Sequence, residues 1–242
     1  MDNRSKILIL VEGDRTDVRL MEHLLDIYGI GENHQIVPYH TNIYTLYNEM
    51  FRDGDPESLD LLQVLKAHEK NPDLKKLFDL YYSDILLVFD LDPQDPQFSP
   101  DKIEEMASYF VESSEMGKLY LNYPMVEAFY HMKDIPDEDY NSYTATMEEL
   151  RSRSYKQRVN RENRNHDQRK FAINRDECST VIRQNIEKAQ LIAKQIPAPD
   201  SMPNLMQVLR CQLEKLSEEN QIAVLCTCAF YIVDFNPNLI KN

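Results

Sequence analysis

Residues 7–17 read ILILVEGDRTD, and the first five side chains, Ile7–Val11, are all apolar. An apolar run without alternation is typical of a strand buried on both faces of a parallel sheet. Residues 16–28 follow with apolar side chains at helical spacing, which predicts a helix directly after the strand. Because a strand followed by a helix is the repeating unit of α/β proteins, this stretch predicts that fold class.

The same alternation continues to about residue 130. The further strands are expected at residues 35–39, 85–89 and 118–122. The further helices are expected at residues 43–80, with breaks near 53–56 and 71–72, and at residues 99–116. We therefore predict an α/β fold with a mostly parallel sheet flanked by helices.

The character of the chain changes near residue 134. An acidic, turn-rich stretch is followed by a strongly basic one, and helical spacing then returns. The apolar run over residues 224–233 predicts a buried helix or an oligomer contact. We expect a catalytic core over residues 1–133, a contact segment over 134–175 and a helical region over 176–242.

Composition limits the class of protein. Of the 242 residues 42% are hydrophobic, which is enough for a sizeable core without disulfides. The four cysteines form no C-x-x-C pair and predict buried thiols of a cytoplasmic protein. No apolar stretch approaches the roughly 20 residues of a membrane-spanning helix. The net charge of −14 disfavours a passive nucleic-acid coat protein, but not an enzyme that meets phosphates through metal ions.

Acidic side chains follow the two most apolar strands directly. Glu12 comes after the first strand, and Asp90 and Asp92 come after the strand at residues 85–89. Ligands of open α/β sheets gather at the carboxyl ends of strands, so these acids converge if the two strands are neighbours. Alternation along an extended chain would place Asp90 and Asp92 on the same side. Carboxylate oxygens of this kind suit Mg²⁺.

Four more residues belong to this expected site. Gly13 leaves space for the turn beside Glu12, Thr16 is expected to cap the following helix, and Asp17 favours its positive end. Glu127 follows the strand at residues 118–122 and supplies a third acidic strand end. One acid after a strand is usually an exposed turn, but the combination at several buried strands favours a functional site.

These motifs resemble those of the Toprim domain, in which a strand ends in Glu-Gly-x-x-(Ser/Thr)-Asp and a later strand ends in Asp-x-Asp. The resemblance covers about residues 6–130. It implies Mg²⁺ or Mn²⁺ held mainly by Asp90 and Asp92, and Glu12 as a metal ligand or general acid/base. The stretch around Glu127 is similar to small Toprim proteins related to OLD-family nucleases and PARIS-type phage-defence effectors, which implies a catalytic role for this residue too.

The resemblance implies a nuclease that cleaves RNA or DNA, with a role as a toxic effector in phage defence. No P-loop is present, so an ATPase of such a system would be a separate chain. Many Toprim nucleases are oligomers, and we expect a homo-oligomer. The chain departs from the family in lacking a zinc-binding region and the glycine that often follows the second strand motif.

The basic segment over residues 151–175 holds nine Lys or Arg against two acidic residues. Such a stretch can bind phosphates, although a solvated helix face or a protein-docking surface would look the same. The residues expected to contact nucleic acid are Arg151, Arg153, Lys156, Arg158, Arg161, Arg164, Arg169 and Lys170.

Two alternative functions remain open. Residues 88–92 also resemble the first motif of haloacid-dehalogenase-type phosphatases, in which Asp90 would be the nucleophile and Asp92 the acid/base. That reading leaves Glu12 unexplained, and Pro93 stands where the phosphatase family has small residues. The other alternative is a Toprim-fold interaction or regulatory subunit without catalysis.

Overall fold

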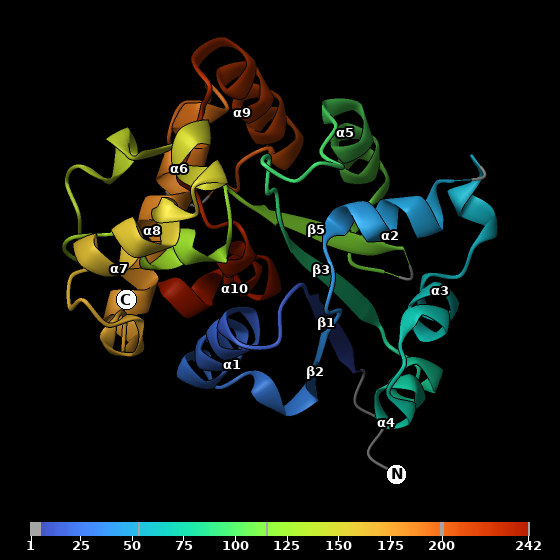
Figure 1. Cartoon of the computed structure of the whole chain (residues 1–242). Helices are drawn as coiled ribbons and strands as arrows, with labels where there is room; N and C mark the ends of the chain where they lie inside the picture. Colours follow the sequence, from blue (N-terminus) through green and yellow to red (C-terminus); the bar gives the residue numbers. More distant parts are fainter. Residues whose placement is uncertain (1–5, 53, 115, 199–200, 242) are drawn as a thin grey trace.

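A five-stranded sheet with the strand order β2-β1-β3-β5-β4 forms the centre of the molecule (Figure 1). This computed structural model describes residues 6–52, 54–114, 116–198 and 201–241. All neighbouring strands are parallel except β4, which is antiparallel to β5, so the predicted mostly parallel α/β sheet is confirmed. The strands are β1 (Ile7–Val11), β2 (His34–Pro38), β3 (Asp84–Asp90), β4 (Val111–Glu112) and β5 (Gly117–Asn122).

Helices cover both faces of this sheet. Helices α1 and α10 lie on one face, and α2, α3 and α5 lie on the other (Figure 1). The helices within residues 1–133 are α1 (Thr16–Tyr28), α2 (Ile43–Met50), α3 (Leu61–His68), α4 (Pro72–Lys75) and α5 (Pro100–Tyr109). Later in the chain come α6 (Met147–Arg151), α7 (Ser154–Glu162), α8 (Arg175–Ile192), α9 (Leu205–Glu219) and α10 (Tyr231–Phe235).

The first strand and helix match the sequence prediction. All of β1 is buried, and α1 begins at Thr16 and ends before Gly29, which adopts a left-handed conformation with φ 65°. The expected capping role of Thr16 is wrong, because Arg15 occupies the N-cap position and Thr16 is already inside the helix. The side chain of Arg15 makes no capping hydrogen bond.

The helix expected over residues 99–116 is shorter than predicted. Helix α5 ends at Tyr109, and the next residues form β4 at the edge of the sheet. A left-handed turn at Gly117, with φ 92°, then leads into β5. The side chain of Phe110 is buried in this arrangement as it would be on a helix, so its apolar character could not distinguish the two.

The C-terminal region packs onto the core through strands and short helices. Strand β6 (Thr144–Thr146) pairs with β7 (Gln221–Ala223), and the backbones of Tyr123 and Leu225 exchange two hydrogen bonds of 2.8 Å. The apolar run over residues 224–233 is buried as expected, but the prediction of one helix is wrong. It contains a β-bridge, the 3₁₀ turn Cys228–Phe230 and the start of α10, because its backbone pairs with the segment after β5.

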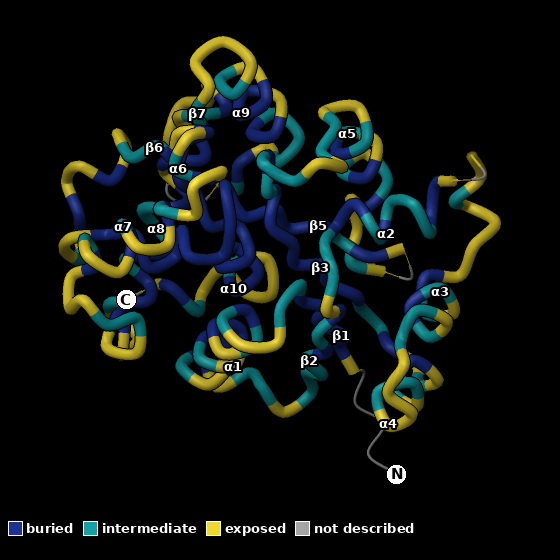
Figure 2. Tube along the Cα trace, in the orientation of Figure 1, coloured by how far each residue is buried: buried dark blue, intermediate teal, exposed yellow. Residues whose placement is uncertain are grey.

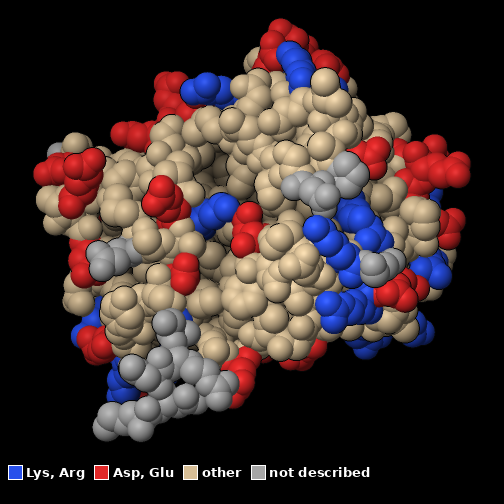
Figure 3. All heavy atoms as spheres, turned by 180° about the vertical axis from the view of Figure 1, so that it is seen from behind, with Lys and Arg blue, Asp and Glu red and all other residues tan. Residues whose placement is uncertain are grey.

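Buried side chains form one continuous hydrophobic cluster from β1 to the C-terminal helices (Figure 2). All four cysteines are buried and free, as predicted. Among the helices that the structure describes, none has both the length and the apolar character needed to cross a membrane. On the face opposite to Figure 1 the charged side chains lie in separate groups, with basic ones gathered toward one side (Figure 3).

Candidate metal centre

The carboxyl ends of β1, β3 and β5 lie next to one another. Val11 pairs with Val88, and Asp90 pairs with Asn122. Beyond the end of β1, the backbone N–H of Glu12 donates to the carbonyl of Val88 over 3.2 Å. The strands that precede the predicted acids are therefore neighbours, as the convergence of these acids requires.

Glu12 and Asp90 are joined directly. The backbone N–H of Asp90 donates to Oε2 of Glu12 over 3.2 Å, and the Asp90 side chain is buried with 7% exposed. Fully buried Asn122 donates from Nδ2 to Oδ1 of Asp90 over 3.4 Å and accepts from the N–H of Cys228 over 3.3 Å. Asn122 is not among the site residues predicted from the sequence. The sequence feature that could have pointed to it is a polar residue at the end of an otherwise apolar strand.

Asp92 reaches the site by a different route from the one predicted. Strand β3 ends at Asp90, so strand alternation does not apply to Asp92, which has a left-handed backbone with φ 42°. Its N–H donates to the carbonyl of Pro124 over 3.1 Å, and its Oδ1 accepts from Nε2 of Gln94 over 2.9 Å. The loop after β3 is thereby fixed to the segment that follows β5.

Asp17 also belongs to the acidic cluster. It lies in the first turn of α1 with 7% exposed, and among the described residues its Oδ1 has no hydrogen-bond partner. A Cβ at position 13 would lie 2.7 Å from Oδ2 of Asp17. Gly13 is therefore needed for the close approach of the Asp17 carboxylate, and not only for the turn that the sequence predicted.

Glu127 faces a lysine from another part of the chain. It lies on the 3₁₀ turn Val126–Tyr130 with 4% exposed, and its Oε1 is 3.0 Å from Nζ of Lys156 on α7. The other oxygen, Oε2, has no hydrogen-bond partner within the described part of the chain. Thus a member of the basic segment contacts the third predicted acid.

Three carboxyl groups of this cluster, those of Glu12, Asp17 and Asp90, have pKa values above their usual range. Burial, and then the charge of Asp92, raises the pKa of Glu12 to about 8. Burial raises the pKa of Asp17 to about 6, with backbone hydrogen bonds opposing and the charge of Glu127 adding to the rise. Burial, and then the charge of Glu12, raises the pKa of Asp90 well above its usual range. Repulsion between the carboxylates favours protonation or a bound cation.

The cluster fits a divalent cation in its chemistry. It offers carboxylate oxygens, which Mg²⁺ prefers, and two of them are buried without a partner in the described residues. As the side chains lie, no three Asp, Glu, His or Cys side chains in the described ranges already surround one point. Binding would therefore require carboxylate side chains to rotate toward a shared ion. Asp90, Asp92 and Glu12 are the residues that would hold it.

A hollow of about 650 Å³ lies beside Asp92, between the loop after β3 and the turn from α6 to α7. Its lining residues are Asp92, Gln94, Asp95, Pro96, Met125, Leu150, Arg151, Arg153, Tyr155 and Lys156. Three members of the predicted basic set, Arg151, Arg153 and Lys156, therefore line the same hollow as an acid of the cluster.

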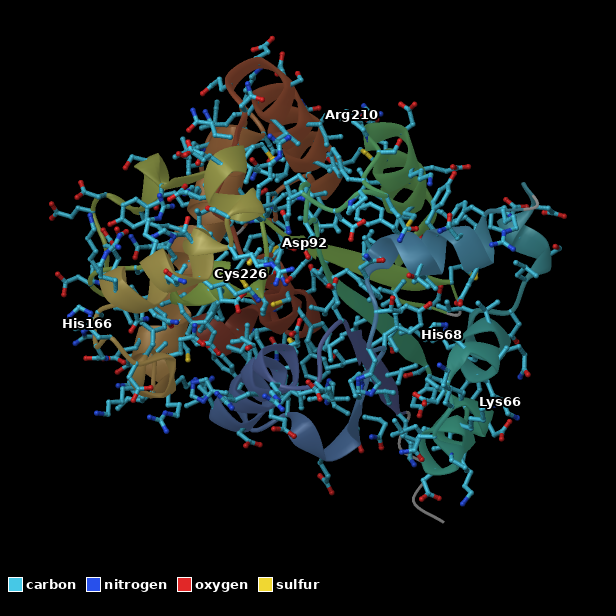
Figure 4. All side chains as sticks on the ribbon, viewed as in Figure 1. Lys66, His68, Asp92, His166, Arg210 and Cys226 are labelled. Carbon is cyan, nitrogen blue, oxygen red and sulfur yellow. The ribbon has the colours of Figure 1, made fainter. Side chains whose placement is uncertain are left out.

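The structure does not bring the rest of the basic segment to this hollow. His166, from the same segment, lies at the outer edge of the molecule, far from Asp92 (Figure 4). Four of the residues expected to contact nucleic acid form ion pairs: Arg158 with Glu149 at 2.8 Å, Arg161 with Glu162 at 3.2 Å, Arg164 with Glu177 at 2.9 Å and Arg169 with Asp167 at 3.0 Å. Lys170 is exposed outside the hollow.

Comparison of the chain with protein-family models, with curated proteins and with solved structures finds no match. The resemblance to Toprim domains therefore depends on the two sequence motifs alone. What the chain does has to be inferred from the chemistry of the acidic cluster and of the hollow beside it.

Proposed function

We propose that this protein is a Toprim-like nuclease, a Mg²⁺- or Mn²⁺-dependent hydrolase of phosphodiester bonds in nucleic acid. The observation that carries the proposal is the group of acids Glu12, Asp90 and Asp92 at and just beyond two adjacent strand ends. Asp90 is buried and the other two are half-buried, and desolvation and neighbouring acidic charges raise the pKa of all three. A fold retains such mutual repulsion at a cost in stability, and clusters of this kind are typical of functional sites.

Each acid has a distinct place in the proposed chemistry. Asp90 and Asp92 would hold the ion, and Glu12 would complete the ligand set or accept a proton from the attacking water. When bound, the ion would stabilise charge on the phosphate and make a water molecule more acidic. The Asp90 N–H keeps the Glu12 carboxylate in position.

Lys156 connects the acids with the hollow. Its Nζ contacts Glu127 at 3.0 Å, and 57% of its side chain is exposed. Burial lowers the pKa of Lys156, but Glu127 and the neighbouring acids raise it above its usual range, so the ammonium stays charged. A fixed positive charge at this place would stabilise the charge that develops on a phosphate during cleavage. On the sequence resemblance alone, we extend the proposal to an effector in phage defence that acts as a homo-oligomer beside a separate ATPase.

The test is a cleavage assay of the purified full chain. Single- and double-stranded DNA, plasmid and total tRNA are incubated with Mg²⁺, Mn²⁺ or EDTA. Asp90→Asn and Glu12→Gln are compared with Asp14→Asn, which changes an exposed acid in the same loop. We expect cleavage that needs the metal, falls at least about a hundredfold in the first two variants and persists in the third.

Other outcomes separate the alternatives. Thermal stabilisation by Mg²⁺ that is lost in Asp90→Asn, without cleavage of any substrate, would contradict the nuclease and favour a binding module. Hydrolysis of a phosphate monoester that requires Asp90 but not Glu12 would instead favour the phosphatase. Equal activity in Asp90→Asn and wild type would remove the acidic cluster from the reaction altogether.

A further inference from the structure

We infer that the hollow beside Asp92 is the substrate groove and that it takes an unpaired strand of nucleic acid, not a duplex. The inference depends on the proposed function for its substrate class. It goes beyond that function by naming which conformation of nucleic acid can reach the acids, and which two arginines hold it.

The size and position of the hollow carry the first step. At about 650 Å³ it falls in the range of pockets that enclose a small ligand, which is the scale of one or two nucleotides. Asp92 belongs both to its lining and to the acidic cluster, since its charge raises the pKa of Glu12. A strand of nucleic acid lying in the hollow would therefore place one of its phosphates near the acids.

Three acids of the cluster lie below the surface. Asp90, Asp17 and Glu127 have 7%, 7% and 4% of their surface exposed, whereas Glu12 and Asp92 are half-buried. Because Asp92 lines the hollow, the space between the loop after β3 and the turn from α6 to α7 gives a phosphate a way to the acids. In a duplex each phosphate is held on the outside of a wide, stiff cylinder with its bases paired. An unpaired strand is narrower and more flexible than a duplex, so it can lay a phosphate into a recess that a duplex does not enter.

Two arginines on the wall of the hollow have no side-chain partner among the described residues. In the part of the chain that the structure describes, neither Arg151 nor Arg153 forms an ion pair or a side-chain hydrogen bond, whereas Arg158 and Arg161 on the following helix α7 are paired with glutamates. Charged groups left without a partner beside a recessed site are available for phosphates.

The backbone of the turn supports a binding role. Arg153 adopts a left-handed conformation with φ 58°, which is uncommon for a residue with a long side chain. Such backbone strain persists where the surroundings fix it, and it is concentrated at ligand-binding and active sites. The strained turn joins α6 to α7 and so sets where Arg151 and Arg153 meet the hollow.

The remaining lining suits an unstacked base. Pro96, Met125 and Leu150 supply apolar surface, and the planar guanidinium groups of the two arginines can stack on a base. A base paired inside a duplex presents no free face to such a surface. The lining thus combines apolar and cationic side chains on the side of the α6–α7 turn with Asp92 and Asp95 on the side of the loop after β3, and apolar with cationic groups is the combination that proteins use for single-stranded nucleic acid.

The test measures binding without cleavage. A fluorescein-labelled 12-nucleotide DNA strand, an RNA strand of the same sequence and the corresponding duplexes are titrated with the full chain in EDTA and in Ca²⁺. The variants are Arg151→Gln, Arg153→Gln and the double variant, with Lys170→Gln as control because Lys170 is an exposed cation outside the hollow. We expect at least one single strand to bind about tenfold more tightly than its duplex. The double variant should lose about tenfold or more, and the control less than twofold.

Equal or tighter duplex binding would overturn the inference, as would a loss in Lys170→Gln as large as in the double variant. The proposed function fails separately. Binding of single strands that depends on the two arginines, without cleavage of any substrate, would support the groove and contradict the nuclease. Metal-dependent cleavage together with binding that is unchanged in both arginine variants would support the nuclease and contradict the proposed groove.

Discussion

The backbone N–H of Asp90 donates a hydrogen bond of 3.2 Å to Oε2 of Glu12, so the end of β3 holds the carboxylate that follows β1. This bond favours the charged form of Glu12, yet burial and the charge of Asp92 outweigh it and raise the pKa to about 8. The two strand ends thus hold two acids side by side that cannot both ionise without cost.

This relationship predicts how the stability of the metal-free protein depends on pH. Below pH 4.5 Glu12 is protonated in both the folded and unfolded states. Between pH 4.5 and 8 the unfolded chain loses this proton while the folded chain keeps it, so the folded state becomes less stable as pH rises. We expect Glu12 to contribute a loss on the order of 2–4 kcal/mol in unfolding free energy over this window.

Urea unfolding in EDTA at pH 5 and pH 8 measures this loss. The wild-type protein should lose more stability than Glu12→Gln, whose side chain stays neutral, and Mg²⁺ should restore stability at pH 8. Asp14→Asn is the control, because its exposed acid should leave the pH dependence unchanged. A wild-type curve parallel to that of Glu12→Gln would contradict the raised pKa.

A second prediction concerns Gly13, the glycine next to the Asp17 carboxylate. In Gly13→Ala the new methyl group would meet Oδ2 of Asp17 at 2.7 Å, and the carboxylate would have to move. We expect a loss of about 1–3 kcal/mol in unfolding free energy and weaker Mg²⁺ binding. Gly31→Ala is the matched control, since its methyl group would meet nothing closer than 3.7 Å.

A double-mutant cycle with Asp17→Ala identifies the cause. Once the carboxylate is removed, Gly13→Ala should cost at least about 1 kcal/mol less than it does in the wild-type protein. An unchanged cost would show that the glycine is needed for its backbone and not for the approach of Asp17.

Lys156 carries the third prediction. Lys156→Met removes the ammonium 3.0 Å from Glu127 while leaving a side chain of similar length. The acids then have less compensating charge, so Mg²⁺ should bind severalfold more tightly, while turnover falls about tenfold to a hundredfold because charge on the phosphate is less stabilised. Stability should change by less than about 1 kcal/mol, since the side chain is 57% exposed.

Titration of Mg²⁺ by calorimetry and single-turnover cleavage measure the two effects separately. Arg161→Met on the same helix is the control, because Arg161 is 72% exposed and pairs with Glu162 outside the hollow. Turnover equal to wild type in Lys156→Met would show that the lysine only balances charge in the metal-free protein.

The strands and most acids of the site could be predicted because their signals are local. The apolar runs that became β1 and β3 are buried on both faces, and the acid after each one lies at the strand end where the sequence places it. The positions of Glu12 and Asp90 at the strand ends can thus be predicted from short stretches of sequence, without knowing which strands are neighbours.

The rest depends on contacts between distant segments, which a single sequence does not reveal. Asp92 turns through a left-handed backbone fixed by the segment after β5, and Asn122 contacts Asp90 only because their strands pair. The basic segment looked uniform along the chain. Its folding places Arg151 and Arg153 at the hollow and directs the following arginines to glutamates elsewhere.

A last prediction concerns the contact that fixes the distance between Glu127 and Lys156. Buried His131 follows the 3₁₀ turn of Glu127 and contacts α7 twice, at 3.3 Å from Nδ1 to the Tyr155 hydroxyl and at 3.1 Å from Nε2 to Glu162. Burial lowers the pKa of His131 to about 4, so at neutral pH one ring nitrogen donates and the other accepts. His131→Asn should lower the unfolding free energy by about 2–3 kcal/mol, because both partners lose their hydrogen bond. It should also reduce turnover about tenfold, since α7 would no longer hold Lys156 in place.

His166→Asn is the matched control for this variant. His166 is exposed and has a left-handed backbone that asparagine accepts, so neither stability nor turnover should change. Because Lys156 is the residue displaced, His131→Asn should lose much of its effect on turnover when it is made in the Lys156→Met protein, while its effect on stability should remain. Full additivity of the two losses of turnover would show that His131 acts on the reaction by some route other than the position of α7.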